Sequence, residues 1–141
     1  LYFAVGAETG RHRIEAADDP GRVARITYTY LPVLLVAGII VTAVADELTV
    51  AHPGGHDADL ATVLTLIGGP ALYVFGNLLF KKVTSGRVPL SHLVGLALLV
   101  VVGLVGLRAE PLSLSIATTV ILFGIAYWEQ RLGESRAAHR A

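Results

Sequence analysis

Apolar residues form four long runs along the chain, separated by short polar connections. The runs free of acidic and basic residues cover 26–45, 60–80, 88–107 and 111–128. Each is close to the roughly 20 residues that an α-helix needs to cross a hydrocarbon layer of about 30 Å. Runs such as LVGLALLVVVGLVGL are apolar on every side, unlike barrel strands or the helices of soluble proteins. The pattern predicts an all-α integral membrane protein, a bundle of four transmembrane helices at about 26–48, 60–80, 88–107 and 111–129.

Composition agrees with this class. Hydrophobic residues make up 54% of the chain, above the roughly 45–50% of soluble domains. Eleven Lys and Arg residues balance eleven Asp and Glu residues, so no charge excess points to a nucleic acid. The absence of cysteine excludes disulfides and thiolate metal sites. The expected partners are the lipid bilayer and other transmembrane helices, from the same chain, a homo-oligomer or a larger membrane complex.

The flanking segments are polar. Residues 130–141 are expected to form a cytoplasmic tail, and residues 1–25 the end of a preceding helix plus a cytoplasmic juxtamembrane segment. Asp19-Pro20 predicts a helix start, with Asp19 as N-cap. The chain contains no methionine and opens on the apolar LYFAV, so we expect a C-terminal fragment of a larger polytopic protein.

Basic residues alternate between the two sides of the predicted spans. Counted from the N-terminus, the five polar segments hold four, none, three, one and three of them. Because lysine and arginine favour the cytoplasmic side, both ends of the chain and the connection before the third span are predicted to be cytoplasmic. The acidic connection after the first span then faces outward, and the protein is expected in the bacterial inner membrane.

Small and hydroxyl-bearing residues share one side of three spans, at about 100° of rotation per residue. Such faces allow close helix packing in lipid. They comprise Thr27, Gly38, Thr42 and Ala45 in the first span, Ser91, His92, Gly95, Gly103 and Gly106 in the third, and Ser115, Thr119, Ala126 and Glu129 in the fourth.

Two carboxylates end the first span. Asp46 and Glu47 are either solvated acids or, with Asp46 bordering the small-residue face, a site for a proton, a cation or a polar group. His52 and His56 could join nearby carboxylates around a metal, but the intervening Pro-Gly-Gly prevents the helical i,i+4 arrangement of ligands. We therefore predict no metal.

Three further features interrupt the apolar spans. Pro32 should bend the first helix unless a new helix starts there. The sequence Gly68-Gly69-Pro70 predicts a break, either a binding site made by a discontinuous helix or, as we favour, a packed kink satisfied by a neighbouring hydroxyl. Asn77 and His92 are expected to serve helix packing or a polar path. The candidate polar site comprises Asp46, Glu47, Gly69, Asn77 and His92.

No phosphate-binding loop and no metalloprotease or hydrolase motif occurs in the sequence. We therefore predict no enzymatic activity and no cofactor.

Several short stretches in fixed order resemble one family. They are the Tyr-rich entry YTYLPVLL, Asp46-Glu47, His52-Pro53, GGPALYVFGN and GRVPLSHLVGL. Together they resemble the C-terminal part of the bacterial low temperature requirement A family, over nearly the whole chain. That family commonly has a histidine after the Tyr-x-Tyr entry, where this chain has Pro32. The resemblance implies further helices upstream and adaptation to cold or stress, without a known molecular activity.

Two functions remain open. The chain could belong to a transport or stress-adaptation protein whose polar residues line a path between helices. Alternatively, it could be a structural or accessory subunit that packs within a larger membrane complex through its small-residue faces.

The topology can be tested by cysteine labelling, because the chain has no cysteine. We expect Gly55→Cys to react with a membrane-impermeant maleimide added to intact cells, and Ser85→Cys to react only after lysis. The opposite labelling would reverse the predicted orientation.

Overall fold

The computed structural model describes residues 19–51, 59–86, 88–106 and 109–138, and it is helical almost throughout them. No strand occurs in this part of the chain, which confirms the all-α prediction. The elements are α2 (Pro20–Arg25), the π-helical turn η1 (Ile26–Tyr30), α3 (Leu31–Ala51), α4 (Leu60–Ser85), α5 (Leu90–Gly106) and α6 (Pro111–Ala138). Asp19 caps α2 as predicted, since its Oδ1 accepts a hydrogen bond from the Arg22 amide at 2.9 Å.

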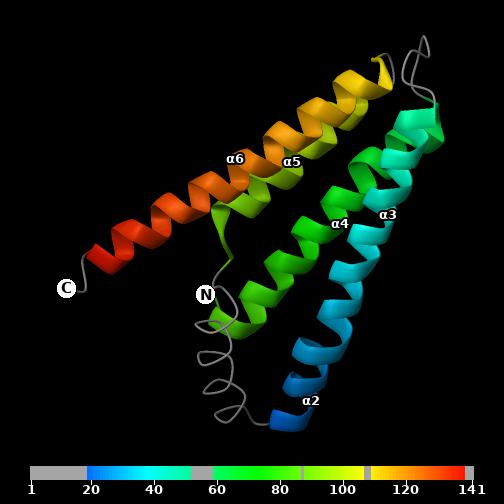
Figure 1. Cartoon of the computed structure of the whole chain (residues 1–141). Coiled ribbons are helices and arrows are strands. Elements are labelled where there is room, and N and C mark those ends of the chain that lie inside the picture. The colour runs from blue at the N-terminus through cyan, green and yellow to red at the C-terminus, as the bar shows by residue number, and fades with distance from the viewer. Residues whose placement is uncertain (1–18, 52–58, 87, 107–108, 139–141) are drawn as a thin grey trace.

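The helices form two pairs, α3 with α4 and α5 with α6 (Figure 1). The pairs meet mainly through α4, which contacts both α5 and α6. They converge where α3 ends and α6 begins, and they diverge toward the opposite end (Figure 1). The two pairs are therefore held together most closely at one end of the molecule.

Within the described part of the chain, three helices are long and apolar enough to cross a membrane: Pro20–Ala51, Leu60–Ser85 and Pro111–Arg131. The fourth predicted span, α5, is a shorter apolar helix of 17 residues, or about 25 Å at 1.5 Å per residue. The predicted membrane bundle is confirmed, with α5 shorter than expected. The predicted cytoplasmic tail, residues 130–141, starts inside α6, because this helix continues to Ala138.

Many large apolar side chains face outward, whereas the buried positions combine leucines and valines with hydroxyl-bearing residues. Val33 on α3 is 63% exposed and Phe123 on α6 is 73% exposed, whereas Thr27, Thr49 and Thr118 are buried. Thr49 and Thr118 donate their hydroxyls to carbonyl oxygens one turn earlier in their own helices, which removes most of the cost of burying them. This distribution suits a lipid exterior, where packing holds the helices together.

The closest approach between helices joins α3 and α4. A Cβ atom added to Gly38 would lie 2.7 Å from the backbone nitrogen of Tyr73, and one added to Gly69 would lie 2.6 Å from that of Thr42. No real Cβ atom sits at such distances, so the two backbones touch only because both positions are glycine. Gly38 and Thr42 of the predicted small-residue face thus lie in the packing contact with α4.

In the α5–α6 contact, side chains and not backbone atoms pack against the glycines. Gly95 and Gly106 on α5 leave space that the side chains of Ile125 and Leu114 on α6 fill. The residues predicted to form the face of the third span are buried, except Gly103, which is half-buried. The predicted face of the fourth span is wrong in part, because Thr119 and Ala126 are exposed. In this contact the glycines of α5 therefore face large side chains of α6 and not its backbone.

Neither interior proline breaks its helix. Before Pro32 the helix widens into η1, in which the Leu31 amide bonds to the Ile26 carbonyl five residues earlier, and it then continues without a restart. Pro70 lies inside an unbroken α4, so the discontinuous helix predicted as one alternative does not form. Gly69 explains this in part, because proline disfavours a helical conformation in the preceding residue through that residue's Cβ atom.

Two adjacent glycines provide a matched test of the α3–α4 contact. Gly69→Ala should destabilise the protein by about 1–3 kcal/mol, because the new methyl group meets backbone rather than a flexible side chain. Gly68→Ala should be neutral or stabilising, since nothing lies within 4 Å of that position. Thermal unfolding in detergent measures both, and equal losses of stability would contradict the assignment.

Candidate functional site

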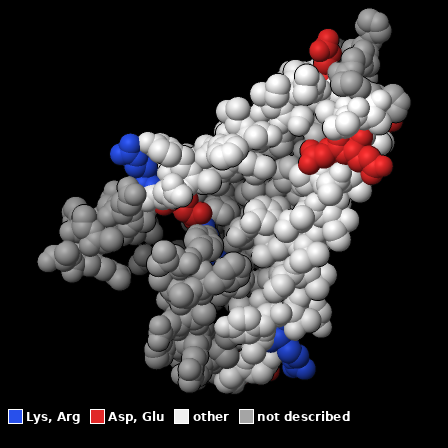
Figure 2. Space-filling view, viewed as in Figure 1, with Lys and Arg blue, Asp and Glu red and all other residues white. Residues whose placement is uncertain are grey.

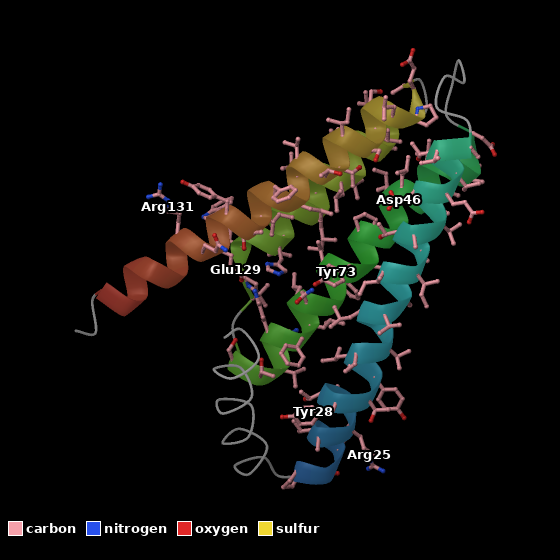
Figure 3. All side chains as sticks on the ribbon, viewed as in Figure 1. Arg25, Tyr28, Asp46, Tyr73, Glu129 and Arg131 are labelled. Carbon is pink, nitrogen blue, oxygen red and sulfur yellow. The ribbon has the colours of Figure 1, made fainter. Side chains whose placement is uncertain are left out.

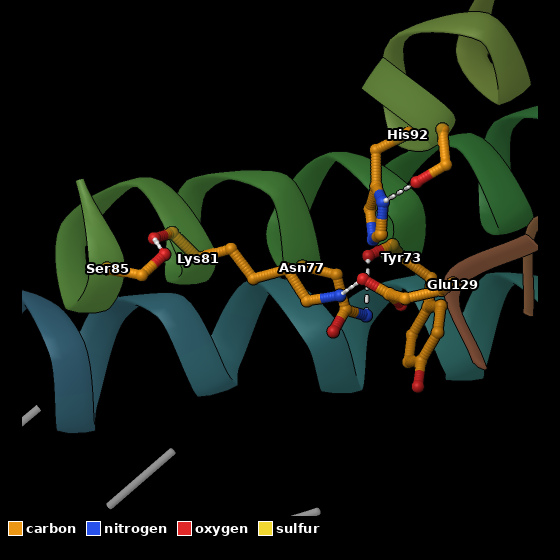
Figure 4. A network of polar contacts seen from close by, with 7 residues as sticks. Tyr73, Asn77, Lys81, Ser85, His92 and Glu129 are labelled. Carbon is orange, nitrogen blue, oxygen red and sulfur yellow. Dashed lines mark hydrogen bonds and ion pairs between the residues drawn. The ribbon is translucent and has the colours of Figure 1, made fainter. Parts of the chain in front are cut away.

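An ion pair joins the two helix pairs near their diverging ends. Nζ of Lys81 on α4 donates to Oε1 of Glu129 on α6 (Figure 4). Their side chains are 17% and 32% exposed, so water screens the pair less than it screens surface charges. Charges within apolar helices are costly unless paired, and they commonly mark functional positions.

A buried histidine from a third helix lies beside this pair. His92, near the start of α5, is 4% exposed, and its Nδ1 lies 3.3 Å from Oγ of the adjacent Ser91. The ring points toward Asn77 and Glu129 (Figure 4). Helices α4, α5 and α6 thus each contribute a charged or titratable group.

Asn77 completes the cluster from α4, one turn before Lys81. Its Nδ2 donates to the Tyr73 carbonyl at 3.2 Å, and its side chain is half-buried. We call Asn77, Lys81, His92 and Glu129 the polar cluster.

The structure brings together two of the five residues predicted for the site, Asn77 and His92. Gly69 belongs to the α3–α4 contact. Asp46 and Glu47 are exposed on α3, and Asp46 lies toward the converging end, away from Glu129 (Figure 3). Asp46 therefore does not point into the bundle that the described helices form.

Lys81 and Glu129 were missed by the sequence reasoning. Lys81 was counted among the basic residues of a cytoplasmic connection, and Glu129 among the small residues of a packing face. The signal in the sequence was that each of these residues carries a charge at the end of a long apolar run. Their pairing across 48 residues depends on the packing of α6 against α4, which sequence periodicity does not specify.

The described part of the chain contains no group of three His, Asp or Glu side chains suited to a metal ion. The metal alternative considered at His52 and His56 falls outside the described residues.

Comparison with known proteins assigns the family. The model of the bacterial low temperature requirement A protein (LtrA) matches residues 1–127. The chain belongs to the LtrA family. A protein of Rhizobium meliloti (strain 1021), described as uncharacterised, is 32% identical over 132 residues, which are 92% of this chain and 31% of that protein. The LtrA-family chain thus spans about a third of this curated relative, and no solved structure matches it.

A double-mutant cycle can measure the strength of the ion pair. We expect Lys81→Ala and Glu129→Ala each to destabilise the protein, because each removes one half of a partly buried ion pair. The double variant should lose less than the sum, with a coupling of about 0.5–3 kcal/mol in thermal unfolding. Lys82→Ala, the exposed neighbour, serves as the control, and additive losses would show that the pair contributes no coupling.

Proposed function

We propose that this LtrA-family protein transports a small polar solute across the bacterial cytoplasmic membrane through the polar cluster. The observation that carries the proposal is the Lys81–Glu129 ion pair between two helix pairs, beside the buried His92. A purely structural bundle gains little from burying charges, since well-packed apolar residues hold helices together at least as well.

The position of the cluster supports this proposal. It lies where the helix pairs diverge, and the space-filling view shows a hollow with acidic atoms at its edge on that side (Figure 2). The opposite ends are in close contact through Ala45, Val63, Leu66 and Leu114. The polar cluster thus lies near the diverging end, and a packed core closes the opposite end. This arrangement is compatible with a transporter that opens to one side of the membrane at a time.

The orientation proposed from the basic residues is compatible with this arrangement. Asp46 lies toward one end of the molecule, and Arg25 lies toward the opposite end of the same continuous helix (Figure 3). With the basic end and the C-terminus in the cytoplasm, the polar cluster lies nearer the cytoplasmic side.

An accessory role is the second candidate, and one feature favours it. The outward side of η1 and α3 forms a shallow apolar groove that another transmembrane helix could fill. Its lining consists of Tyr28, Thr29, Pro32, Val33, Val36, Ala37 and Ile40.

Growth in the cold separates these candidates, because the family is named for that requirement. In a strain lacking the protein, we expect full-length Lys81→Met to fail to restore growth at low temperature, since the polar cluster loses its cation. The control is Asp46→Asn/Glu47→Gln, which removes exposed charges and should restore growth. Immunoblots of membranes verify equal abundance.

Two results would contradict the proposal. Normal growth with Lys81→Met at wild-type abundance would favour the accessory role. Loss of growth with only the Asp46/Glu47 variant would move the site to the acidic end of α3.

A further inference from the structure

We propose that the apolar groove along η1 and α3 is filled by a transmembrane helix from the part of the full-length protein that lies outside this chain. This helix crosses α3 on the side away from α4, and it carries a hydrogen-bonding side chain at the level of Thr29. The groove belongs to a different part of the molecule from the polar cluster, so the inference does not depend on the transport proposal.

The groove has the form of a helix-packing surface. Its lining residues fall into two rows, in each of which a residue follows the previous one by four positions. One row contains Tyr28, Pro32, Val36 and Ile40, and the other contains Thr29, Val33 and Ala37. Rows with this spacing form ridges on a helix, and the space between two ridges receives a ridge of a neighbouring helix that crosses at about 50°. The lining therefore matches what one crossing helix requires.

The side of α3 that carries the groove is uncovered in the described part of the chain. Thr27 and Gly38 mark the opposite side, where Thr27 is buried and Gly38 meets the backbone of α4. In contrast, the groove residues Val36 and Ile40 are 53% and 57% exposed. No described helix lies beyond this side of α3 (Figure 1). The longest of the three candidate spans thus packs mainly on one neighbour, α4.

The groove also contains polar groups that an acyl chain of a lipid cannot satisfy. Thr42 and Thr49 donate their hydroxyls to carbonyl oxygens of their own helix at 2.9 and 2.8 Å. Thr29 is exposed, and no described residue accepts a hydrogen bond from its hydroxyl. Pro32 has no amide hydrogen, so a carbonyl oxygen in the preceding turn loses its usual donor. Because neighbouring helices supply partners for such groups within a bilayer, the occupant carries a hydrogen-bonding side chain.

The length of the curated relative indicates where this helix comes from. The matched region is 31% of that protein, so most of its length lies outside the part that this chain represents. A helix of the same polypeptide is tethered near the groove at an effective concentration in the millimolar range. A second copy or a separate subunit instead loses its translational freedom on binding. The same protein therefore supplies the occupant, and the groove is then closed to a partner subunit.

Photo-crosslinking in the full-length protein tests this inference. The photoreactive residue p-benzoylphenylalanine replaces Val36, in the middle of the groove, and membranes are illuminated before purification. We expect a crosslinked product that migrates as a monomer on a denaturing gel. Mass spectrometry should place the crosslink on an apolar peptide from outside residues 1–141.

A second probe and a matched pair of variants test the details of the contact. The same photoreactive residue at Thr29 should reach the same helix, within one turn of a serine, threonine, asparagine, glutamine or histidine. With the probe at Val36, Ala37→Phe should lower the crosslink yield at least about threefold, because the added ring overfills the contact. The control Ala126→Phe, at an exposed position of α6, should leave the yield unchanged. The two probes decide the question even where Ala37→Phe does not fold.

Several results would overturn the inference. A crosslinked dimer would assign the groove to a second copy, an adduct with a different protein to an accessory partner, and lipid adducts alone to the bilayer. A crosslink confined to residues 1–141 would show that this chain covers its own groove. A Thr29 probe that reaches only an apolar stretch would refute the polar contact. The growth test of Lys81→Met is separate, so failure here leaves the transport proposal to be judged by its own result.

Discussion

The backbone contact between α3 and α4 is the constraint on which the rest of the structure depends. At Gly38 and Gly69 the two helices approach until backbone meets backbone, and this fixes their separation and rotation. With α4 held in this way, its other faces are available to α5 and α6. The polar cluster follows from this arrangement, because α4 carries Asn77 and Lys81 toward the second pair.

Hydropathy and small-residue periodicity predicted the architecture well. The four apolar runs became α3 to α6, and the glycine and threonine side of the first span became a packing face. The effects of proline were predicted less well, because they depend on neighbours: Gly69 lacks the side chain that would clash with Pro70, and η1 absorbs Pro32 by widening one turn. The face of α6 depended on the glycines of α5, which periodicity within α6 cannot reveal.

The candidate site was predicted only in part for a related reason. Asn77 and His92 stood out as polar residues within apolar segments, and the structure brings them together. Lys81 and Glu129 sit at the ends of such segments, where charges usually remain in water, and only the crossing of α4 and α6 makes them partners. Asp46 and Glu47 drew attention as adjacent acids, yet their helix turns them outward. The sequence thus identifies the polar residues within apolar segments. Which of these residues become partners depends on the angle at which the helices cross.

The π-helical turn η1 gives the first long helix an unusual internal geometry. A π turn holds one residue more than an α turn, and one residue corresponds to about 100° of rotation. The helical residues before Leu31 are therefore rotated about the helix axis relative to those after it. As a result, residues on the two sides of η1 do not follow one uniform helical periodicity, and the buried Thr27 lies within this turn. Deletion of one residue between positions 26 and 30 would remove this rotation and leave both segments helical.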